Sequence, residues 1–319
     1  EARLHLHRRR QGRGHSRQQH PARRVHLRQP DDRDNYANKR VEISGILLIE
    51  LFRTLYKRHI SELKQSLEKK KQSPDIIKTL QRSKPIITKN ILSAFGTGNW
   101  TATKNSSAYC RTGVAQVLDR MNYMSMISHL RRLVIPIGKE GKNIAIRQIH
   151  ASQIGFICPA ETPEGASAGI NLNVAITAKF SNKSDPIIIR EVLEKCEYIE
   201  SIENICISDL CKYTKISLND NFIGFTKQWK TVVQYIKEMR FRQRIDREVS
   251  VAYIPVENEI KLYSDDGRFL RPLFVLNNNV FEFPTIKLTW NSFVKHSKIV
   301  YLDPSEIESS VIAMYPSYT

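Results

Sequence analysis

The sequence has no long apolar run and few cysteines. No stretch approaches the roughly 20 apolar residues that a helix needs to cross a bilayer, and no hydrophobic core follows the early arginines as in a secretory signal. The five cysteines form no Cys-x-x-Cys pair, and no histidine lies near Cys196, Cys206 and Cys211 to complete a zinc site. We therefore expect scattered, reduced and mostly buried thiols in an intracellular protein without membrane contact.

Short motifs of common catalytic sites are also absent. The sequence contains no glycine-rich phosphate loop, and no serine, histidine and aspartate with the spacing of a nucleophilic triad. It shows no internal repeat at periods of about 20 to 50 residues. With 319 residues, of which 41% are hydrophobic, the chain can form two or three domains with real cores. The expected fold class is mixed α/β (α+β) and multidomain.

Acidic residues are scarce relative to basic ones. Lys and Arg number 50 and Asp and Glu 32, which gives a net charge of +18. Because Lys and Arg release counterions when they neutralise phosphates, such a surplus favours a polyanionic partner. The alternative is a solvated basic surface that only aids solubility.

Residues 1–30 are rich in arginine, histidine and glutamine and contain no lysine. They offer no apolar periodicity, so we expect them to be disordered. One interpretation is a basic arm that binds nucleic acid. The abrupt change of composition at Asp31 also fits a wrong reading frame or a badly joined exon.

Apolar spacing at the helical period predicts several helices. The predicted stripes are Leu48, Leu51, Phe52 and Leu55; Ile87, Ile91, Leu92 and Phe95, ended by a turn at 96–98; Val114, Val117, Leu118 and Met121, followed by a segment around Ile127 and Leu130; and Trp229, Val232, Val233 and Ile236.

Alternation predicts strands farther along the chain. One half-buried strand is expected at 172–180, a short one at 187–189, and another at 249–253. Ile260 and Leu262 lead into Asp266-Gly267, a strong hairpin signal, with 269–276 as the return strand.

Three polar segments could carry chemistry. Carboxylates at 31–34 could hold Mg²⁺, but no second acidic cluster faces them, so local ion pairs within 31–40 are the alternative. Arg131 and Arg132 can each grip phosphate oxygens with a planar fork of donors. The segment then continues into a glycine-containing loop at 136–142, and an ordinary polar hairpin is the alternative interpretation.

Further basic residues accompany this second segment. Lys139 and Lys142 would add charge at the loop tip, and Arg147 and His150 follow just beyond. The third segment, 158–165, is a loop stiffened by two prolines. Its Glu161 and Glu164 could form an acid/base pair or bind metal, or the loop could be purely structural.

Taken in order, these segments resemble the second-largest subunit of cellular and viral multisubunit RNA polymerases, closer to the eukaryotic, archaeal and large-DNA-virus enzymes than to bacterial ones. The matching motifs are 31–40, 98–100, 113–123, 128–132, 147–150, 158–165, 265–268, 271–274 and 312–314. The resemblance covers Asp31 to the C-terminus, as an internal fragment of such a subunit.

The resemblance implies a domain layout. Residues 31–90 would end the protrusion domain, 91–180 would form the fork, 181–280 the first external domain, and 281–319 the start of the second. The family's metal-associated carboxylates, lysines and zinc ribbon would lie beyond Thr319.

It also implies a function, DNA-directed synthesis of RNA from ribonucleoside triphosphates. The implied partners are the DNA template, the RNA product, the largest subunit and smaller subunits. No catalytic residue, metal ligand or cofactor is expected in this chain; Mg²⁺ would act in the assembled enzyme. The location would be the nucleus, or the cytoplasm or a viral factory.

Site residues follow from the same resemblance. Arg131, Arg132 and Arg147 would contact nucleic acid, as would Lys139, Lys142 and His150, and Glu161 and Glu164 would support the nucleotide site. Two other hypotheses remain open: a non-enzymatic module that binds single-stranded nucleic acid, and a non-functional remnant.

Overall fold

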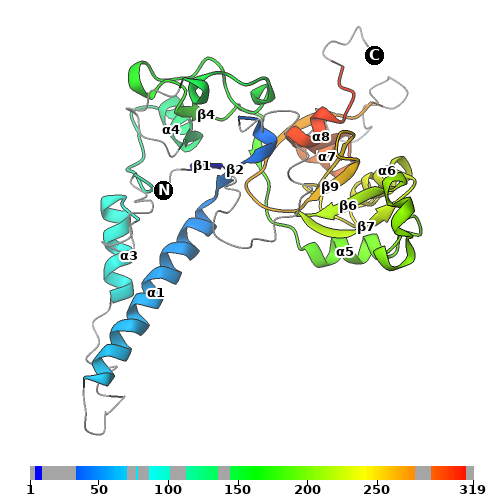
Figure 1. Ribbon diagram of the computed structural model, residues 1–319. Helices are drawn as coiled ribbons and strands as arrows, with labels where there is room; N and C mark the ends of the chain where they lie inside the picture. Colours follow the sequence, from blue (N-terminus) through cyan, green and yellow to red (C-terminus); the bar gives the residue numbers. More distant parts are fainter. Residues whose placement is uncertain are drawn as a thin grey trace. The chain divides into compact units, whose positions relative to one another are not determined.

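The computed structural model describes residues 4–8, 34–69, 77, 86–100, 113–135, 144–276 and 289–313 (Figure 1). The chain forms two compact units. Unit 1 comprises Glu1–His7, Glu42–Arg147 and Glu161–Asn173; unit 2 comprises Arg8–Val41, Gln148–Ala160 and Val174–Thr319. Among the described residues, no helix is both long enough and apolar enough to cross a membrane.

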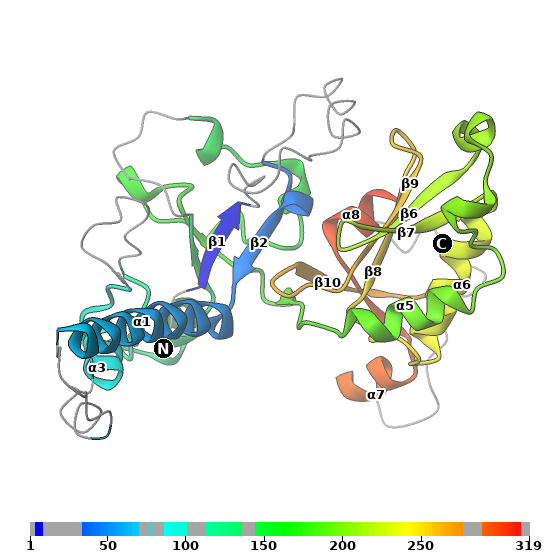
Figure 2. The same cartoon turned by 60° about the horizontal axis from the view of Figure 1, so that its bottom comes forward.

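A pair of helices dominates unit 1. Helix α1 (Ser44–Glu68) packs along α3 (Ile86–Thr97), as Figures 1 and 2 both show. The predicted helix and its end at the 96–98 turn are confirmed, and Gly98 there has a φ of +70°. Its predicted stripe is only half right, because Ile87 and Ile91 pack against the core while Leu92 and Phe95 are exposed. Their shared core consists of Leu47, Leu51, Leu55, Ala94, Trp100 and Val114.

The stripe predicted on α1 is only half right. Leu51 and Leu55 are buried, but Leu48 and Phe52 are about half exposed. The buried positions recur every four residues, starting from Leu47, because α3 contacts a single narrow face of α1.

The rest of unit 1 holds a short helix and a small sheet. Helix α4 (Tyr123–Leu130) leads into β3 (Arg132–Val134), which pairs antiparallel with β4 (Asn171–Asn173) and parallel with β1 (Leu4–Arg8). The helix around Ile127 and Leu130 is thus confirmed. The one predicted at 114–121 is wrong, because 116–120 has no regular structure.

Unit 2 is built on a four-stranded sheet with the order β7-β6-β9-β8. Its strands are β6 (Thr214–Leu218), β7 (Asn221–Thr226), β8 (Ser250–Ile254) and β9 (Glu259–Tyr263). Helices α5 (Pro186–Glu194) and α6 (Trp229–Phe241) share a core with this sheet (Figure 1). The predictions of α6 and β8 are confirmed.

A second sheet of unit 2 has the order β11-β10-β5. It comprises β5 (Lys179–Phe180), β10 (Phe269–Phe274) and β11 (Ile299–Leu302), near α7 (Trp290–Lys295) and α8 (Pro304–Glu308). The remaining elements are strand β2 (Lys39–Glu42) and the 3-10 helices Tyr36–Asn38, Ala145–Arg147, Ala151–Gln153, Gly165–Ser167, Ile202–Asn204 and Ile207–Lys212.

The predicted hairpin at Asp266-Gly267 is wrong. Strand β9 belongs to the first sheet and β10 to the second, so the chain crosses between sheets at this turn. Gly267 has a φ of +75°, and its surroundings leave no space for a side chain, because a Cβ there would lie 2.1 Å from the Val41 carbonyl oxygen. The glycine serves a close backbone approach rather than a tight β-turn.

Three smaller predictions also fail. The segment 172–180 is not one strand but β4 and β5, separated by a turn at which Ile176 is exposed. Residues 187–189 lie in helix α5, because Asp185 caps its N-terminus and Pro186 occupies the first turn. Of the cysteines in the described residues, Cys196 is buried, but Cys206 and Cys211 are exposed.

Candidate nucleic-acid interface

A polar network holds the irregular segment that precedes α4. The Nδ1 atom of His129 accepts the Asp119 backbone N–H at 3.1 Å, so its Nε2 carries the proton and donates to Oε1 of Gln116 at 3.1 Å. The amide nitrogen of Gln116 in turn donates to the Gly113 carbonyl at 3.2 Å. One histidine on α4 therefore fixes the backbone from 113 to 119.

Asp119 fixes the start of α4. Its carboxylate accepts the Ser125 hydroxyl at 2.6 Å and the Met121 backbone N–H at 3.1 Å. These two hydrogen bonds hold the pKa of the Asp119 carboxyl below its usual range, and the positive charge of Arg132 acts in the same direction. Asn122 caps the helix by accepting the Ser125 N–H at 2.7 Å.

Arg131 and Arg132 lie where α4 ends and β3 begins. The Arg131 N–H bonds to the carbonyls of Ile127 and Ser128, which closes the helix. Both side chains are half-buried, and burial lowers the pKa of the Arg131 guanidinium. An arginine in this position remains charged at neutral pH. The structure thus places two arginines that are adjacent in sequence at the junction of α4 and β3 in unit 1.

Arg147 binds protein backbone. Its Nη1 donates to the carbonyls of Ala166 and Ala168, at 2.7 and 2.9 Å. Gly169, with a φ of +72°, lets this contact form, because a Cβ there would lie 2.6 Å from the Arg147 carbonyl oxygen. The side chain therefore holds the loop that follows Glu164.

Glu161 and Glu164 differ in their surroundings. The Glu161 carboxylate accepts a hydrogen bond from the Ser128 hydroxyl of α4, and its backbone carbonyl accepts the side-chain amide of Asn173 at 2.8 Å. Glu164 is exposed and precedes the 3-10 helix Gly165–Ser167 without capping it through its side chain. The structure thus joins Glu161 to the helix that leads to Arg131.

Of the remaining predicted nucleic-acid contacts, the structure describes His150. His150 belongs to unit 2, where its Nδ1 accepts the Ser152 backbone N–H at 3.1 Å. The Ser152 hydroxyl accepts the Tyr36 N–H at 2.9 Å, so His150 supports a local loop. Lys139 and Lys142, as well as the carboxylates of 31–33, lie outside the described residues.

A metal site would need several ligating side chains that face one another. Among the described residues, no group of three or more His, Cys, Asp or Glu side chains is arranged to hold a metal ion. Glu161 and Glu164 therefore do not fit a Mg²⁺ site by themselves. Asp34 lies 3.7 Å from the Lys39 ammonium, an ion pair within the 31–40 segment.

Exposed apolar residues near α4 are a feature that the sequence patterns misassigned. Val117 and Met121 are 93% and 87% exposed, and Tyr123 and Met124 are 72% and 73% exposed. Four such side chains within eight residues form a surface suited to stacking or to a partner protein. The signal for it was Asn122, a good N-cap, which places the helix start after Met121 rather than before it.

Comparisons with known proteins agree on one family. Residues 116–180 match the family description "RNA polymerase Rpb2, domain 3", and 216–277 match "RNA polymerase Rpb2, domain 4". A probable DNA-directed RNA polymerase II subunit RPB2 homolog of Invertebrate iridescent virus 6 is 38% identical over 299 residues, 89% of this chain and 24% of the relative.

Cellular relatives are similar to the same extent. The DNA-directed RNA polymerase II subunit RPB2 of Encephalitozoon cuniculi is 38% identical over 90% of this chain and 26% of its own length. Subunit Rpo2 of the DNA-directed RNA polymerase of Sulfolobus acidocaldarius is 33% identical over 91% of this chain and 27% of its own length. The chain spans about a quarter of the length of these relatives.

Proposed function

We propose that this chain, which belongs to the family of second-largest subunits of DNA-directed RNA polymerases, works as part of an enzyme that makes RNA on a DNA template. The observation that carries the proposal is identity of 33–38% with viral, eukaryotic and archaeal subunits along about nine-tenths of the chain. Its partners are the DNA, the RNA product, the largest subunit and smaller subunits. It acts wherever that DNA lies, in a nucleus, cytoplasm or viral factory.

Within the enzyme, this chain supplies scaffold and nucleic-acid contacts. Mg²⁺ ions in the assembled enzyme would stabilise the attacking and leaving oxygens of nucleotide transfer. The family resemblance implies that their ligands lie in other parts of the enzyme. The fork would occupy 91–180, between the end of the protrusion at 31–90 and the external domains at 181–280 and 281–319.

Arg131 and Arg132 are the proposed phosphate contacts. Each guanidinium can present paired N–H donors to phosphate oxygens, and the α4–β3 turn holds the two side chains at a fixed place. Hydrogen bonds of His129 and Asp119 connect α4 to the segment that precedes it. Lys139, Lys142 and His150 are proposed as further nucleic-acid contacts.

Arg147, Glu161 and Glu164 are proposed to shape the nucleotide side of the site. Arg147 acts as a positioning residue, since its guanidinium holds the carbonyls of the loop after Glu164. Glu161 connects that loop to α4 through Ser128. Glu164 is exposed, and its proposed role is to position the bound nucleotide rather than to transfer a proton.

The test uses the full-length protein, tagged in its source and purified with its associated subunits. Incorporation of labelled ribonucleotide should require DNA template and Mg²⁺. Replacing both Arg131 and Arg132 by alanine should lower the rate at least about tenfold, because a charged hydrogen bond contributes about 1.5–3 kcal/mol. Arg190→Ala, on the exposed side of α5, is the matched control and should change the rate less than about twofold.

A second candidate is a non-enzymatic module that binds single-stranded nucleic acid, which the net charge of +18 favours. It predicts that the purified complex binds single strands but makes no RNA on any template. That result would contradict the polymerase function. A complex without either activity would indicate a non-functional remnant.

A further inference from the structure

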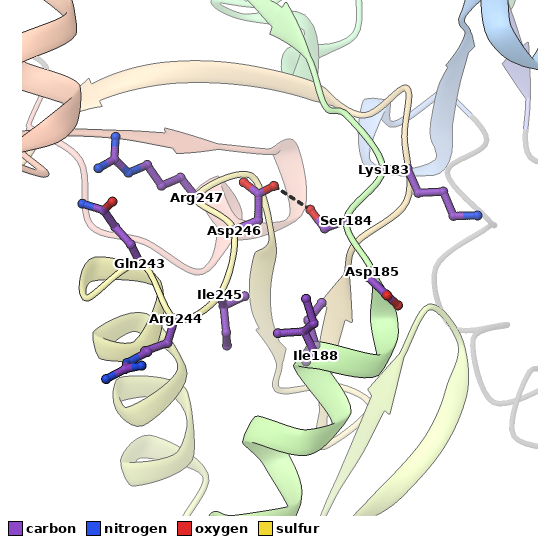
Figure 3. A pocket seen from close by; sticks show the side chains of 10 residues that line it. Lys183, Ser184, Asp185, Ile188, Gln243, Arg244, Ile245, Asp246 and Arg247 are labelled. Carbon is purple, nitrogen blue, oxygen red and sulfur yellow. Dashed lines mark hydrogen bonds between the residues drawn. The ribbon is translucent and has the colours of Figure 1, made fainter.

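A cleft in unit 2 lies away from the residues discussed so far. It has a volume of about 430 Å³ and is formed by two short segments, 183–189 at the start of α5 and 243–247 after α6. Figure 3 shows Ile188 and Ile245 pointing toward each other between the two segments, with Lys183 on one side and Arg244 and Arg247 on the other.

The walls of the cleft are held by internal bonds. The Ser184 N–H bonds to the Ser264 carbonyl at 3.0 Å, and the Arg244 N–H bonds to the Met239 carbonyl at 2.9 Å. Ile245 is buried in the core of the sheet and helices. Such a site is pre-formed, so a ligand would not have to order it on binding.

The floor of the cleft is apolar and partly open. Ile188 is 50% exposed although it lies beside the buried Ile245 and Ile189. An isoleucine in this position gains free energy when an apolar group covers it, about 25 cal/mol for each Å² removed from water. The cleft therefore favours a ligand with an apolar side chain.

The rims of the cleft carry positive charge. Lys183 and Arg244 are exposed, and Arg247 is half-buried with its guanidinium 3.2 Å from the Lys295 carbonyl oxygen. The two carboxylates of the cleft are already engaged. Asp185 caps α5 through the Ile187 N–H at 2.9 Å, and Asp246 accepts the Ser184 hydroxyl at 3.0 Å. Three cations, Lys183, Arg244 and Arg247, stand against these two carboxylates, so the lining of the cleft has a net charge of +1 and favours a ligand of negative charge.

The apolar floor distinguishes between polyanions. A peptide can place an apolar side chain on Ile188 while its acidic residues face the basic rims, whereas the phosphodiester backbone of a nucleic acid has no such side chain.

We propose that the cleft between 183–189 and 243–247 binds a short acidic peptide segment of a partner protein, with one apolar side chain of that segment packed on Ile188. Lys183 on one rim, and Arg244 and Arg247 on the other, contact acidic side chains flanking the apolar one. The site does not depend on the proposed polymerase function.

The test measures binding of the 319-residue chain to a fluorescein-labelled peptide, Glu-Asp-Asp-Leu-Asp-Glu-Asp, by fluorescence anisotropy. Arg244→Glu and Ile188→Asp should each weaken binding about tenfold, because each removes one of the two recognition features. Arg190→Glu, an equal charge reversal on α5 beside Ile188 in sequence but outside the lining of the cleft, should change the affinity less than about twofold. Circular dichroism of each variant confirms that the fold is kept.

Two control ligands identify the chemistry. A peptide with alanine in place of leucine should bind the parent chain more weakly than the leucine peptide does. The Ile188→Asp variant should bind the two peptides with equal affinity. An unlabelled single-stranded DNA should fail to displace the peptide at equal charge concentration. The proposal is overturned if the leucine peptide does not bind, if Arg190→Glu weakens it as much as Arg244→Glu, or if DNA displaces it and Ile188→Asp has no effect.

Discussion

At the scale of single residues, unit 1 uses conspicuous polar side chains to hold backbone. His129 and Asp119 bind the main chain around the start of α4, and Arg147 binds two carbonyls of the loop after Glu164. A side chain engaged in this way determines a local conformation, so replacing it changes the shape of the site before it changes its charge. The exposed Tyr123 and Met124 depend on the same network for their place.

The role of Arg147 shows why sequence alone reached only part of the site. The family resemblance implied a nucleic-acid contact for Arg147, as for the adjacent pair Arg131-Arg132. The partners of Arg147, however, are carbonyls about twenty residues farther along the chain. Every residue has a backbone carbonyl, so the carbonyls that accept these hydrogen bonds cannot be identified from the pattern of side chains in the sequence.

Gly267 gives a residue-scale prediction. Gly267→Ala should lower the free energy of unfolding by about 3 kcal/mol or more, because it combines a positive φ with a Cβ 2.1 Å from the Val41 carbonyl oxygen. Gly165→Ala is the matched control, since Gly165 has a φ of +71° but no atom within 4 Å of its Cβ, and should cost about 1 kcal/mol. Urea unfolding followed by fluorescence measures both; equal losses would contradict the close approach.

At the scale of elements, the sequence predicted helices and strands correctly where the pattern of apolar residues within the segment determines the structure. Helix α6 has a full apolar stripe and strand β8 a clear alternation, and both form where expected. The hairpin at Asp266-Gly267 failed because pairing partners are chosen over long distances: β10 pairs with β5 and β11 instead of β9. The strand expected at 187–189 failed because three consecutive isoleucines fit an amphipathic helix as well as a strand, and only Ile189 of the three is buried in α5.

Helix α8 gives the element-scale prediction. Its Glu306 is fully buried, accepts both terminal nitrogens of Arg240 at 2.7 and 2.8 Å, and accepts the Val251 N–H at 3.3 Å. Glu306→Ala should destabilise unit 2 by about 3–5 kcal/mol, because it leaves the buried Arg240 charge without its partner. The measurement is urea unfolding of the full chain.

A double variant separates the loss of the pair from the loss of packing. Arg240→Met combined with Glu306→Leu removes both charges and keeps similar volume, so it should recover a large part of the lost stability. If the double variant is as unstable as Glu306→Ala, the ion pair is not the cause.

At the scale of the whole molecule, the two units are interleaved in sequence. Each is assembled from separated stretches, so neither corresponds to one continuous half of the chain. Each nevertheless has a core of its own: the α1–α3 core in unit 1, and the core of the four-stranded sheet with α5 and α6 in unit 2. A unit with its own core can unfold by its own cooperative transition.

The three tryptophans make this testable. Trp100 lies in the core of unit 1, 5.6 Å from the Phe95 ring, while Trp229 and Trp290 belong to unit 2. Unfolding in urea should show two fluorescence transitions, and Trp100→Phe should abolish one while leaving the midpoint of the other unchanged. The change is mild, because among the described residues the buried Trp100 Nε1 has no hydrogen-bond partner to lose. A single transition whose midpoint shifts in Trp100→Phe would contradict this expectation. It would mean that the two cores unfold as one cooperative unit, because a change in the core of unit 1 would then also change the unfolding of unit 2.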